Sequence, residues 1–218
     1  ARQKPFWLKP SRLEPSRSRS ASGGRFGMEG DTLARERSGE GEAEAQAVLK
    51  ELQALLKLNL AYIEPLSRGP AEILQHLLLG SCDDARRPEA LRKIGVTHVL
   101  NCASRNVITG AKFYEPFGIG YSEFVAEDCQ GYNIIQHYDT VAKLAEDAAT
   151  AGGRLFVHCE AGVNRSGTLC IAYHAVSTGA PLLESARHCK AQRGRICTNT
   201  AFQSQLFDFV RARGLRLQ

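Results

Sequence analysis

Residues 154–168 read RLFVHCEAGVNRSGT: an apolar run, a short polar turn with one glycine, and the start of a second apolar segment. The pattern predicts a buried strand that runs into Cys159, a tight loop, and a helix that begins near Arg165. Such a loop directs several backbone N–H groups toward a helix N-terminus, where they can bind an anion. The stretch therefore predicts a phosphate-binding loop between a strand and a helix.

Three residues of this loop suit phosphate chemistry. Gly162 permits the turn and lets the backbone approach a ligand closely. Arg165 offers a planar fork of N–H donors for bidentate contact with phosphate. Cys159 lies at the base of the loop, where the N–H groups and the positive helix end favour the thiolate form of a cysteine. The loop is predicted to bind a dianion and to supply the nucleophile that attacks it.

His158 and Ser166 are predicted to assist. An imidazole beside the thiol can help to hold the loop and the thiolate, and the Ser166 hydroxyl can hydrogen-bond the sulfur and ease its departure. Taken singly, each residue has a structural explanation. His158 would be a buried core histidine, Ser166 would cap a helix, and Cys159 would be a small buried apolar residue. Their combination at this spacing favours catalysis.

A phosphate-transfer site also needs a proton donor for the departing oxygen, and Asp128 is the candidate. It follows a predicted strand, 119–125, and precedes a predicted helix, 134–150. The carboxyl ends of parallel strands gather at one edge of a sheet, so Asp128 and the Cys159 loop are expected to lie together. Glu127 is the competing acid, and a loop acid or helix cap is the alternative for both.

Outward from the loop, short apolar segments alternate with segments of helical periodicity. The pattern predicts an α/β fold: a central, mostly parallel sheet of about five strands, flanked by helices, with the cysteine loop between the last core strand and a helix. The predicted strands are 73–79, 96–102, 119–125 and 155–157. The predicted helices are 83–94, with Asp83-Asp84 as its cap, 134–150, 166–177, 182–193 and 200–213.

Charge divides the chain into two parts. The sequence has 218 residues, with 28 Lys and Arg against 23 Asp and Glu, a net charge of +5. Seven positive charges and one negative charge lie in residues 1–27, so the rest is nearly neutral, which disfavours a nucleic-acid partner. The exception is the C-terminal third, which is locally basic through Arg187, Lys190, Arg193, Arg195, Arg211, Arg213 and Arg216.

The N-terminal segments are predicted to lie outside the catalytic domain. Residues 1–42 are rich in Ser, Arg, Gly and Glu, which predicts a disordered tail. Met28 is the only methionine, and we expect it to be the natural start, with 1–27 upstream of it. Residues 43–69 are predicted to form an amphipathic helix, over 43–61, and a linker, and the helix is expected to pack on its own domain.

Several classes of protein are excluded. No apolar run reaches the roughly 18 residues of a membrane-spanning helix, so no membrane partner is expected, and no apolar core of a secretory signal is present. The cysteines have no Cys-x-x-Cys pair, which argues against a disulfide framework and a zinc site. Reduced thiols in a cytoplasmic or nuclear protein fit this pattern. The cysteines are Cys82, Cys102, Cys129, Cys159, Cys170, Cys189 and Cys197.

The loop resembles the His-Cys-x5-Arg-Ser/Thr signature of the cysteine-based protein phosphatases. Over roughly residues 70–211 the chain resembles a dual-specificity phosphatase, and a catalytic domain of that kind is expected at 70–214. The flanking matches are ILQHLLLGS at 73–81, IGVTHVLN at 94–101, VAED at 125–128 with Asp128 on the family's general-acid position, and Arg193 and Asn199 near its late Arg and Pro-Asn positions.

The resemblance implies a two-step mechanism without a metal or other cofactor. The Cys159 thiolate attacks phosphorus while Asp128 protonates the leaving oxygen, and a phosphocysteine forms. Asp128 then acts as a base for water, and Ser166 assists the departing thiolate. The implied substrate is a phosphoprotein carrying phosphotyrosine or phosphoserine/threonine, with a mitogen-activated kinase as the guess at family level. The phosphate would be held by Glu160, Ala161, Gly162, Val163, Asn164 and Arg165.

Departures from the family pattern leave other functions open. Thr198-Asn199 stands in place of the usual Pro-Asn, and Asn164 in place of a more common Ser. Asn164 before Arg165 resembles RNA 5′-triphosphatases, which share the cysteine loop. An RNA 5′-phosphatase is therefore the alternative enzyme, and a phosphoprotein-binding scaffold with little catalysis is the alternative outside enzymes.

A further hypothesis concerns oxidation. An accessible thiolate oxidises readily, and a neighbouring thiol can protect it as a disulfide. Cys102 ends the strand expected beside the Cys159 strand, where some relatives place a resolving cysteine. Cys129, next to Asp128, is the other candidate. Ordinary buried thiols are the alternative for both.

Overall fold

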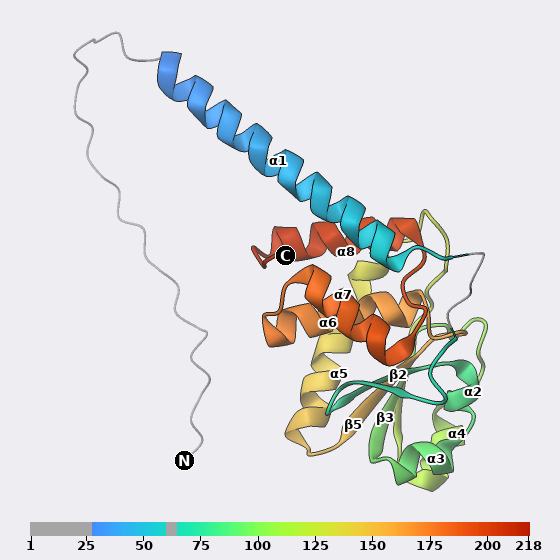
Figure 1. The fold of residues 1–218 in the computed structure, drawn as a ribbon. Coiled ribbons are helices and arrows are strands. Elements are labelled where there is room, and N and C mark those ends of the chain that lie inside the picture. The colour runs from blue at the N-terminus through green and yellow to red at the C-terminus, as the bar shows by residue number, and fades with distance from the viewer. Residues whose placement is uncertain (1–27, 60–64) are drawn as a thin grey trace, which may run out of the picture. The chain divides into compact units, whose positions relative to one another are not determined.

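A five-stranded sheet forms the centre of the fold. The computed structural model describes the backbone of residues 28–59 and 65–218, and side chains from residue 41 onward (Figure 1). The strands are β1 Ala71–Leu74, β2 Leu77–Gly80, β3 Val96–Asn101, β4 Gly120–Glu123 and β5 Arg154–His158. They lie in the order β1-β2-β5-β3-β4, and neighbours are parallel except for β1 and β2. The predicted mostly parallel sheet is confirmed.

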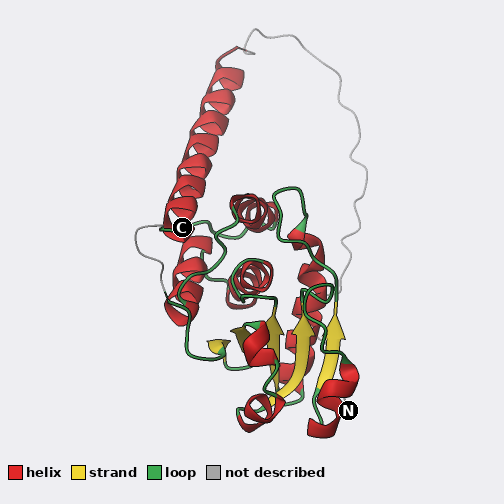
Figure 2. Ribbon diagram, turned by 90° about the vertical axis from the view of Figure 1, so that its right-hand side faces the viewer, coloured by secondary structure: helices red, strands yellow, loops and turns green. Residues whose placement is uncertain are grey.

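Helices cover both faces of this sheet (Figure 2). They are α2 Cys82–Ala85, α3 Pro88–Lys93, α4 Ala111–Tyr114, α5 Tyr138–Thr150, α6 Arg165–Thr178, α7 Leu182–Arg193 and α8 Thr200–Ala212, with 3-10 turns η1 Glu115–Phe117 and η2 Ile134–His137. Alternate residues of a strand point to opposite faces. Leu155 and Val157 of β5 therefore join a core with α5, α6, α7 and α8, whereas Phe156 joins a core with α2, α3 and α4.

The single strand predicted at 73–79 is instead a hairpin of β1 and β2. Gln75 and His76 form the turn, and Ala71 pairs with Leu79 in antiparallel register. The two polar residues interrupt the apolar run, and the chain reverses there. Strand β2 then pairs in parallel with β5, which positions its end beside the cysteine loop.

The helix predicted at 83–94 is two short helices, α2 and α3. Pro88 occupies the first position of α3, where a missing N–H is tolerated, but a proline cannot continue a preceding helix. The cap of α2 is Ser81, which forms a capping box with Asp84, rather than the predicted Asp83-Asp84. The helix predicted from residue 134 begins as η2 and continues as α5, and α6, α7 and α8 match their predicted bounds to within one residue.

Helix α1 spans Met28–Leu56, so residues 28–42 are helical where the sequence predicts disorder. They include LARER at 33–37, and Leu, Ala, Arg and Glu have high helix propensity. Residues 1–27 of the predicted tail and the predicted helix end at 60–61 lie outside the described residues. The natural start at Met28 stays a prediction.

Residues 41–56 of α1 belong to the same compact unit as the sheet. Glu51 is paired with Arg187 of α7, and Lys190 of α7 donates to the carbonyl oxygen of Leu55 at 2.7 Å. The prediction that this amphipathic helix packs on its own domain is confirmed. Within the described residues, no helix has the length and apolar character needed to cross a membrane. The buried positions of the helix are Ala45, Val48, Leu52 and Leu56.

Candidate active site

The cysteine loop, residues 159–164, joins the end of β5 to the start of α6. The loop needs a glycine at position 162, because its backbone there comes very close to the backbone of Gly80. Gly162 has a φ of +66°, and a Cβ at this position would lie 2.2 Å from the carbonyl oxygen of Gly80. The loop therefore turns tightly against the end of β2.

Arg193 of α7 holds the middle of the cysteine loop from outside. Its side chain is 1% exposed, and its guanidinium donates to the carbonyl oxygens of Ala161 at 2.9 Å and Gly162 at 3.1 Å. The sequence relates Arg193 to a family position but gives it no role. Its contacts assign it to loop support, because it binds carbonyl groups on the outer side.

The loop's N–H groups consequently face inward. The carbonyl oxygens of Glu160 and Val163 also accept outside bonds, from the backbone N–H groups of Cys82 at 2.9 Å and Cys197 at 2.8 Å. The C=O and N–H of one trans peptide bond point in opposite directions. Outward carbonyls at four successive residues therefore turn the N–H groups of 161–164 toward the inside, as an anion-binding loop requires.

The Cys159 sulfur lies at the inner end of this loop. The residue is 1% exposed, and the Ser166 hydroxyl donates to Sγ at 3.2 Å. Ser166 is the second residue of α6, so the sulfur lies at the positive, N-terminal end of that helix. The structure thus brings together the predicted nucleophile and the predicted assisting hydroxyl.

Arg165, the first residue of α6, contacts both the cysteine loop and the acid loop, residues 124–128. One Nη donates to the carbonyl oxygen of Ala126 at 3.3 Å, and the other lies 3.5 Å from the Glu160 carboxylate. The residue is 4% exposed, and its buried Nε has no hydrogen-bond partner among the residues that the structure describes. An unpaired buried donor costs free energy that a phosphate oxygen would recover, so this guanidinium fits an anion.

His158 supports the loop backbone rather than contacting the sulfur. Burial lowers its pKa to about 4, so the ring is neutral at physiological pH. Its Nδ1 lies 3.0 Å from the carbonyl oxygen of Cys159, which can only accept, so Nδ1 carries the proton. The ring therefore anchors the start of the loop.

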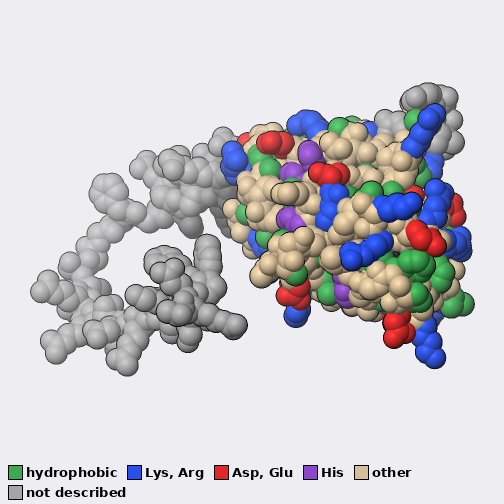
Figure 3. All heavy atoms as spheres, turned by 90° about the horizontal axis from the view of Figure 1, so that it is seen from below, with side chains coloured by type: hydrophobic (Ala, Val, Ile, Leu, Met, Phe, Trp, Pro, Cys, Tyr) green, Lys and Arg blue, Asp and Glu red, His purple; other side chains and the backbone are tan. Residues whose placement is uncertain are grey.

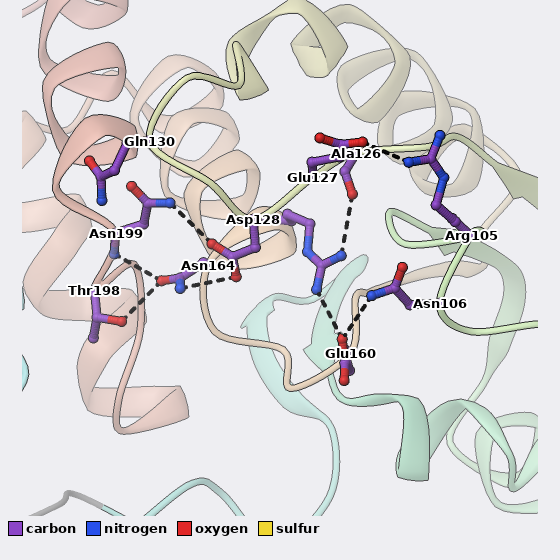
Figure 4. Close-up of a pocket in the computed structure, with 11 residues that line it drawn as sticks. Arg105, Asn106, Ala126, Glu127, Asp128, Gln130, Glu160, Asn164, Thr198 and Asn199 are labelled. Atoms are coloured by element: carbon purple, nitrogen blue, oxygen red, sulfur yellow. Dashed lines mark hydrogen bonds and ion pairs between the residues drawn. The ribbon is translucent and has the colours of Figure 1, made fainter.

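Of the two candidate acids, Asp128 faces the cysteine loop and Glu127 does not (Figure 4). Asp128 accepts hydrogen bonds from two asparagine side chains, each at 3.1 Å, and lines a cavity of about 260 Å³ together with Cys159. Glu127 is paired with Arg105 at 2.7 Å. The structure therefore brings Asp128, as expected, to the edge of the sheet where the cysteine lies.

Two ring-bearing residues, Tyr132 and His137, contact the acid loop. The Tyr132 hydroxyl donates to the carbonyl oxygen of Val125 at 2.7 Å and lies 2.7 Å from His137 Nε2. The ring of His137 stacks on Phe124 at 3.9 Å between centroids. Sequence reasoning missed Tyr132 and His137, because nothing in their local pattern distinguishes them from ordinary loop and helix residues.

Leu58 also lines the cavity of Cys159 and Asp128. It lies in the segment after α1, which the sequence marks only as helix and linker. An apolar side chain from outside the sheet and its covering helices thus contributes to the wall of this cavity. This cavity adjoins a wider depression of about 670 Å³ on the side of the acid loop. Arg105 and Gln130 are among the residues that line the depression.

The two candidate redox partners differ in placement. Cys102 is fully buried after β3, and its backbone N–H donates to the carbonyl oxygen of His158, the neighbour of Cys159. Burial and then the nearness of Cys159 raise the pKa of the Cys102 thiol. Cys129 is exposed in the segment after Asp128, and all seven cysteines are free thiols. Among the described side chains, no group of three or more His, Cys, Asp or Glu could hold a metal ion.

Sequence comparisons match the part of the chain that carries this site. The family model described as dual specificity phosphatase, catalytic domain, matches residues 77–212. The chain is 34% identical over 141 residues to human dual specificity protein phosphatase 2, which covers 65% of this chain and 43% of that protein. It is 35% identical over 141 residues to rat dual specificity protein phosphatase 26, and the match covers 64% of this chain and 66% of that protein. The chain spans less than half the length of the first of these curated relatives.

Solved structures share the fold. The human tyrosine phosphatase-like serine/threonine/tyrosine-interacting protein has a TM-score of 0.61 at 26% identity, covering 67% of this chain and 99% of that chain. Human DUSP28 also has a TM-score of 0.61, at 24% identity, and the match covers 69% of this chain and 98% of that chain. The predicted arrangement of sheet and flanking helices is therefore one that known proteins adopt.

Proposed function

This chain belongs to the dual specificity phosphatase catalytic-domain family, and on that premise we propose that it is a protein phosphatase that works through a phosphocysteine. The observation that carries the proposal is the outward bonding of the four loop carbonyl groups, which turns the loop N–H groups inward, with the Ser166 hydroxyl 3.2 Å from the Cys159 sulfur. Inward N–H groups with Arg165 beside them suit three equatorial phosphate oxygens. The proposed substrates are phosphotyrosine and phosphoserine/threonine in proteins.

The proposed reaction has two steps. In the first, the Cys159 thiolate forms an S–P bond, the P–O bond to the substrate breaks, and the proton of Asp128 moves to the leaving oxygen. In the second, Asp128 takes a proton from water, which attacks phosphorus, and the S–P bond breaks. Ser166 then hydrogen-bonds the departing thiolate, and phosphate is released. Every group in this sequence belongs to the chain, the substrate or water, and none is a cofactor.

For the protein substrate we propose a phosphorylated mitogen-activated kinase, on family resemblance, and for the location the cytoplasm, the nucleus or both. The alternatives are an RNA 5′-phosphatase and a binding scaffold. Outside residues 1–27 the positive and negative charges nearly balance, and both kinds of side chain are interspersed on the face of the molecule seen in Figure 3. This charge balance suits a protein substrate better than a polyanion. The presence of Cys159, Arg165 and Asp128 in one cavity favours catalysis over a scaffold.

Trapping the intermediate tests the proposal. The protein, in a metal chelator, is mixed with an aryl phosphate, quenched with acid and digested for mass spectrometry. We expect phosphate on the peptide of Cys159, and in steady state we expect turnover of phosphotyrosine and phosphoserine peptides. Turnover of triphosphate RNA without turnover of peptides would favour the alternative enzyme. Phosphate binding without any turnover would favour the scaffold.

Leu58 is expected to contribute to substrate binding. In Leu58→Ala, loss of apolar contact with the substrate should raise KM for a phosphotyrosine peptide about fivefold, roughly 1 kcal/mol, with little change in kcat. Leu58→Met, which keeps the volume, is the control and should retain the KM of the parent. An unchanged KM in Leu58→Ala, measured by steady-state kinetics, would show that Leu58 does not touch the substrate.

For the redox hypothesis, Cys102 is the better-supported partner. It follows Asn101, which pairs with His158, so Cys102 and Cys159 lie at about the spacing of adjacent strands, roughly 5 Å, which suits a disulfide. Peroxide oxidises the Cys159 thiolate to a sulfenic acid, and the Cys102 thiol then displaces water. We expect a Cys102–Cys159 peptide after non-reducing digestion, absent from Cys102→Ser. Sulfinic acid on Cys159 without that peptide would contradict the pairing.

A further inference from the structure

We propose that Asn164 is a positioning residue that holds Asp128 where it can donate its proton. The inference rests on the proposed function and deepens the part of Asp128 in it. Asn164 is the N-cap residue of α6, a position at which asparagine usually bonds to the N–H groups of its own helix. Its side chain makes no such bond and instead reaches Asp128 of the acid loop (Figure 4).

The partners of the Asn164 amide fix its orientation. Oδ1 accepts from the backbone N–H of Asn199 and from the Thr198 hydroxyl, both at 3.1 Å. A backbone N–H can only donate, so the amide oxygen must face it and the amide nitrogen must face the opposite way. Nδ2 accordingly donates to Oδ2 of Asp128 at 3.1 Å. One side chain thus links the acid loop to the segment before α8.

Asn199 holds the second oxygen of the same carboxyl group. Its Nδ2 donates to Oδ1 of Asp128 at 3.1 Å, while its own Oδ1 caps α8 by accepting from Ala201 and Phe202. Asp128 is exposed, so without these two bonds its side chain would be free to rotate. A carboxyl oxygen has two lone-pair sites, so one bond on each oxygen leaves a site for the transferred proton.

Asn164 also belongs to the cysteine loop, next to Arg165. The distance between the proton donor and the bound phosphate is therefore set through the loop that holds the phosphate. A general acid displaced by about 1 Å can cost a factor of about 10² in rate. Serine has a shorter side chain with a single oxygen, so it could not bond to the Asn199 N–H and also span the distance to Asp128.

The test compares the parent with Asn164→Ala and Asn164→Ser on aryl phosphates whose leaving phenols are progressively less acidic. A poor leaving group depends more on the acid. The loss in kcat/KM should therefore grow from under about threefold for the most acidic phenol to about thirtyfold for one with the pKa of tyrosine, about 10. The inhibition constant of inorganic phosphate should change by less than about twofold, because the N–H ring and Arg165 remain.

A double-mutant cycle separates positioning from loop support. In an Asp128→Ala background, Asn164→Ala should add no loss that depends on the leaving group. A loss of equal size for every leaving group, or one that persists unchanged in that background, would overturn the inference and make Asn164 a structural residue. Failure of the parent protein to hydrolyse any aryl phosphate would contradict the proposed function itself, and the inference with it.

Discussion

Cys159→Ser is expected to lower turnover of a small aryl phosphate by more than about a thousandfold. A serine hydroxyl needs a base to take its proton, and the group bonded to this position, the Ser166 hydroxyl, is itself a donor. His158 is a weak base, because burial lowers its pKa to about 4, and its ring bonds to the carbonyl oxygen of Cys159 rather than to the side chain at this position. The measurement is steady-state release of the phenol.

Cys129→Ser is the matched control for this change. Cys129 is exposed and follows Asp128, so the same replacement of sulfur by oxygen is made close to the site but outside the loop. Under reducing conditions its turnover should stay within about twofold of the parent, because surface substitutions have small effects. Binding of inorganic phosphate to Cys159→Ser should persist. Residual turnover within tenfold of the parent would show that the sulfur is not the nucleophile.

The part of the fold that was predicted from sequence is the part with strong local signals. Strand β3 and helices α6, α7 and α8 have apolar patterns with clear ends, and the structure forms them within a residue or two of the expected bounds. The rule that strand ends gather at one edge of a parallel sheet was enough to expect Asp128 near Cys159. That rule concerns topology, so it survives errors in the bounds of single elements.

The errors arose where one residue decides between two structures. His76 and Gln75 turn an apolar run into a hairpin, and Pro88 divides one predicted helix into α2 and α3. A proline inside a helical pattern usually ends the helix at the preceding residue, so the sequence itself carries the signal that separates α2 from α3. At the start of α1, residues of high helix propensity lie in a segment whose composition is typical of disorder, and the segment is helical from Met28.

Within the candidate site, the sequence predicts the residues of the cysteine loop motif. It does not predict the residues from other elements that contact the loop or line its cavity. Cys159, Arg165 and Ser166 lie in a short stretch with a chemical pattern. Arg193 contacts the loop only because α7 packs beside it, and Leu58 reaches the cavity only because α1 packs on α7. Contacts of that kind depend on tertiary packing, which leaves no periodic or spacing signal in the sequence.

Asp128→Asn is expected to lower kcat/KM for phenyl phosphate by about a hundredfold, the lower end of what a general acid contributes. The amide keeps the size of the side chain but has no proton to transfer, so the phenolate must leave unprotonated. Steady-state release of phenol by the parent and by Asp128→Asn measures the difference.

Glu127→Gln is the matched control, since it makes the same chemical change one residue earlier in the acid loop. Glu127 is paired with Arg105 on the exposed rim, where an ion pair contributes little, so its loss should change kcat/KM by less than about threefold. If Glu127→Gln instead lowered kcat/KM about a hundredfold and Asp128→Asn changed it by less than about threefold, the roles of the two acids would be reversed. The amide bonds on both oxygens of Asp128 argue for the first outcome, because they hold this carboxyl group, and not its neighbour, toward the loop that carries Cys159.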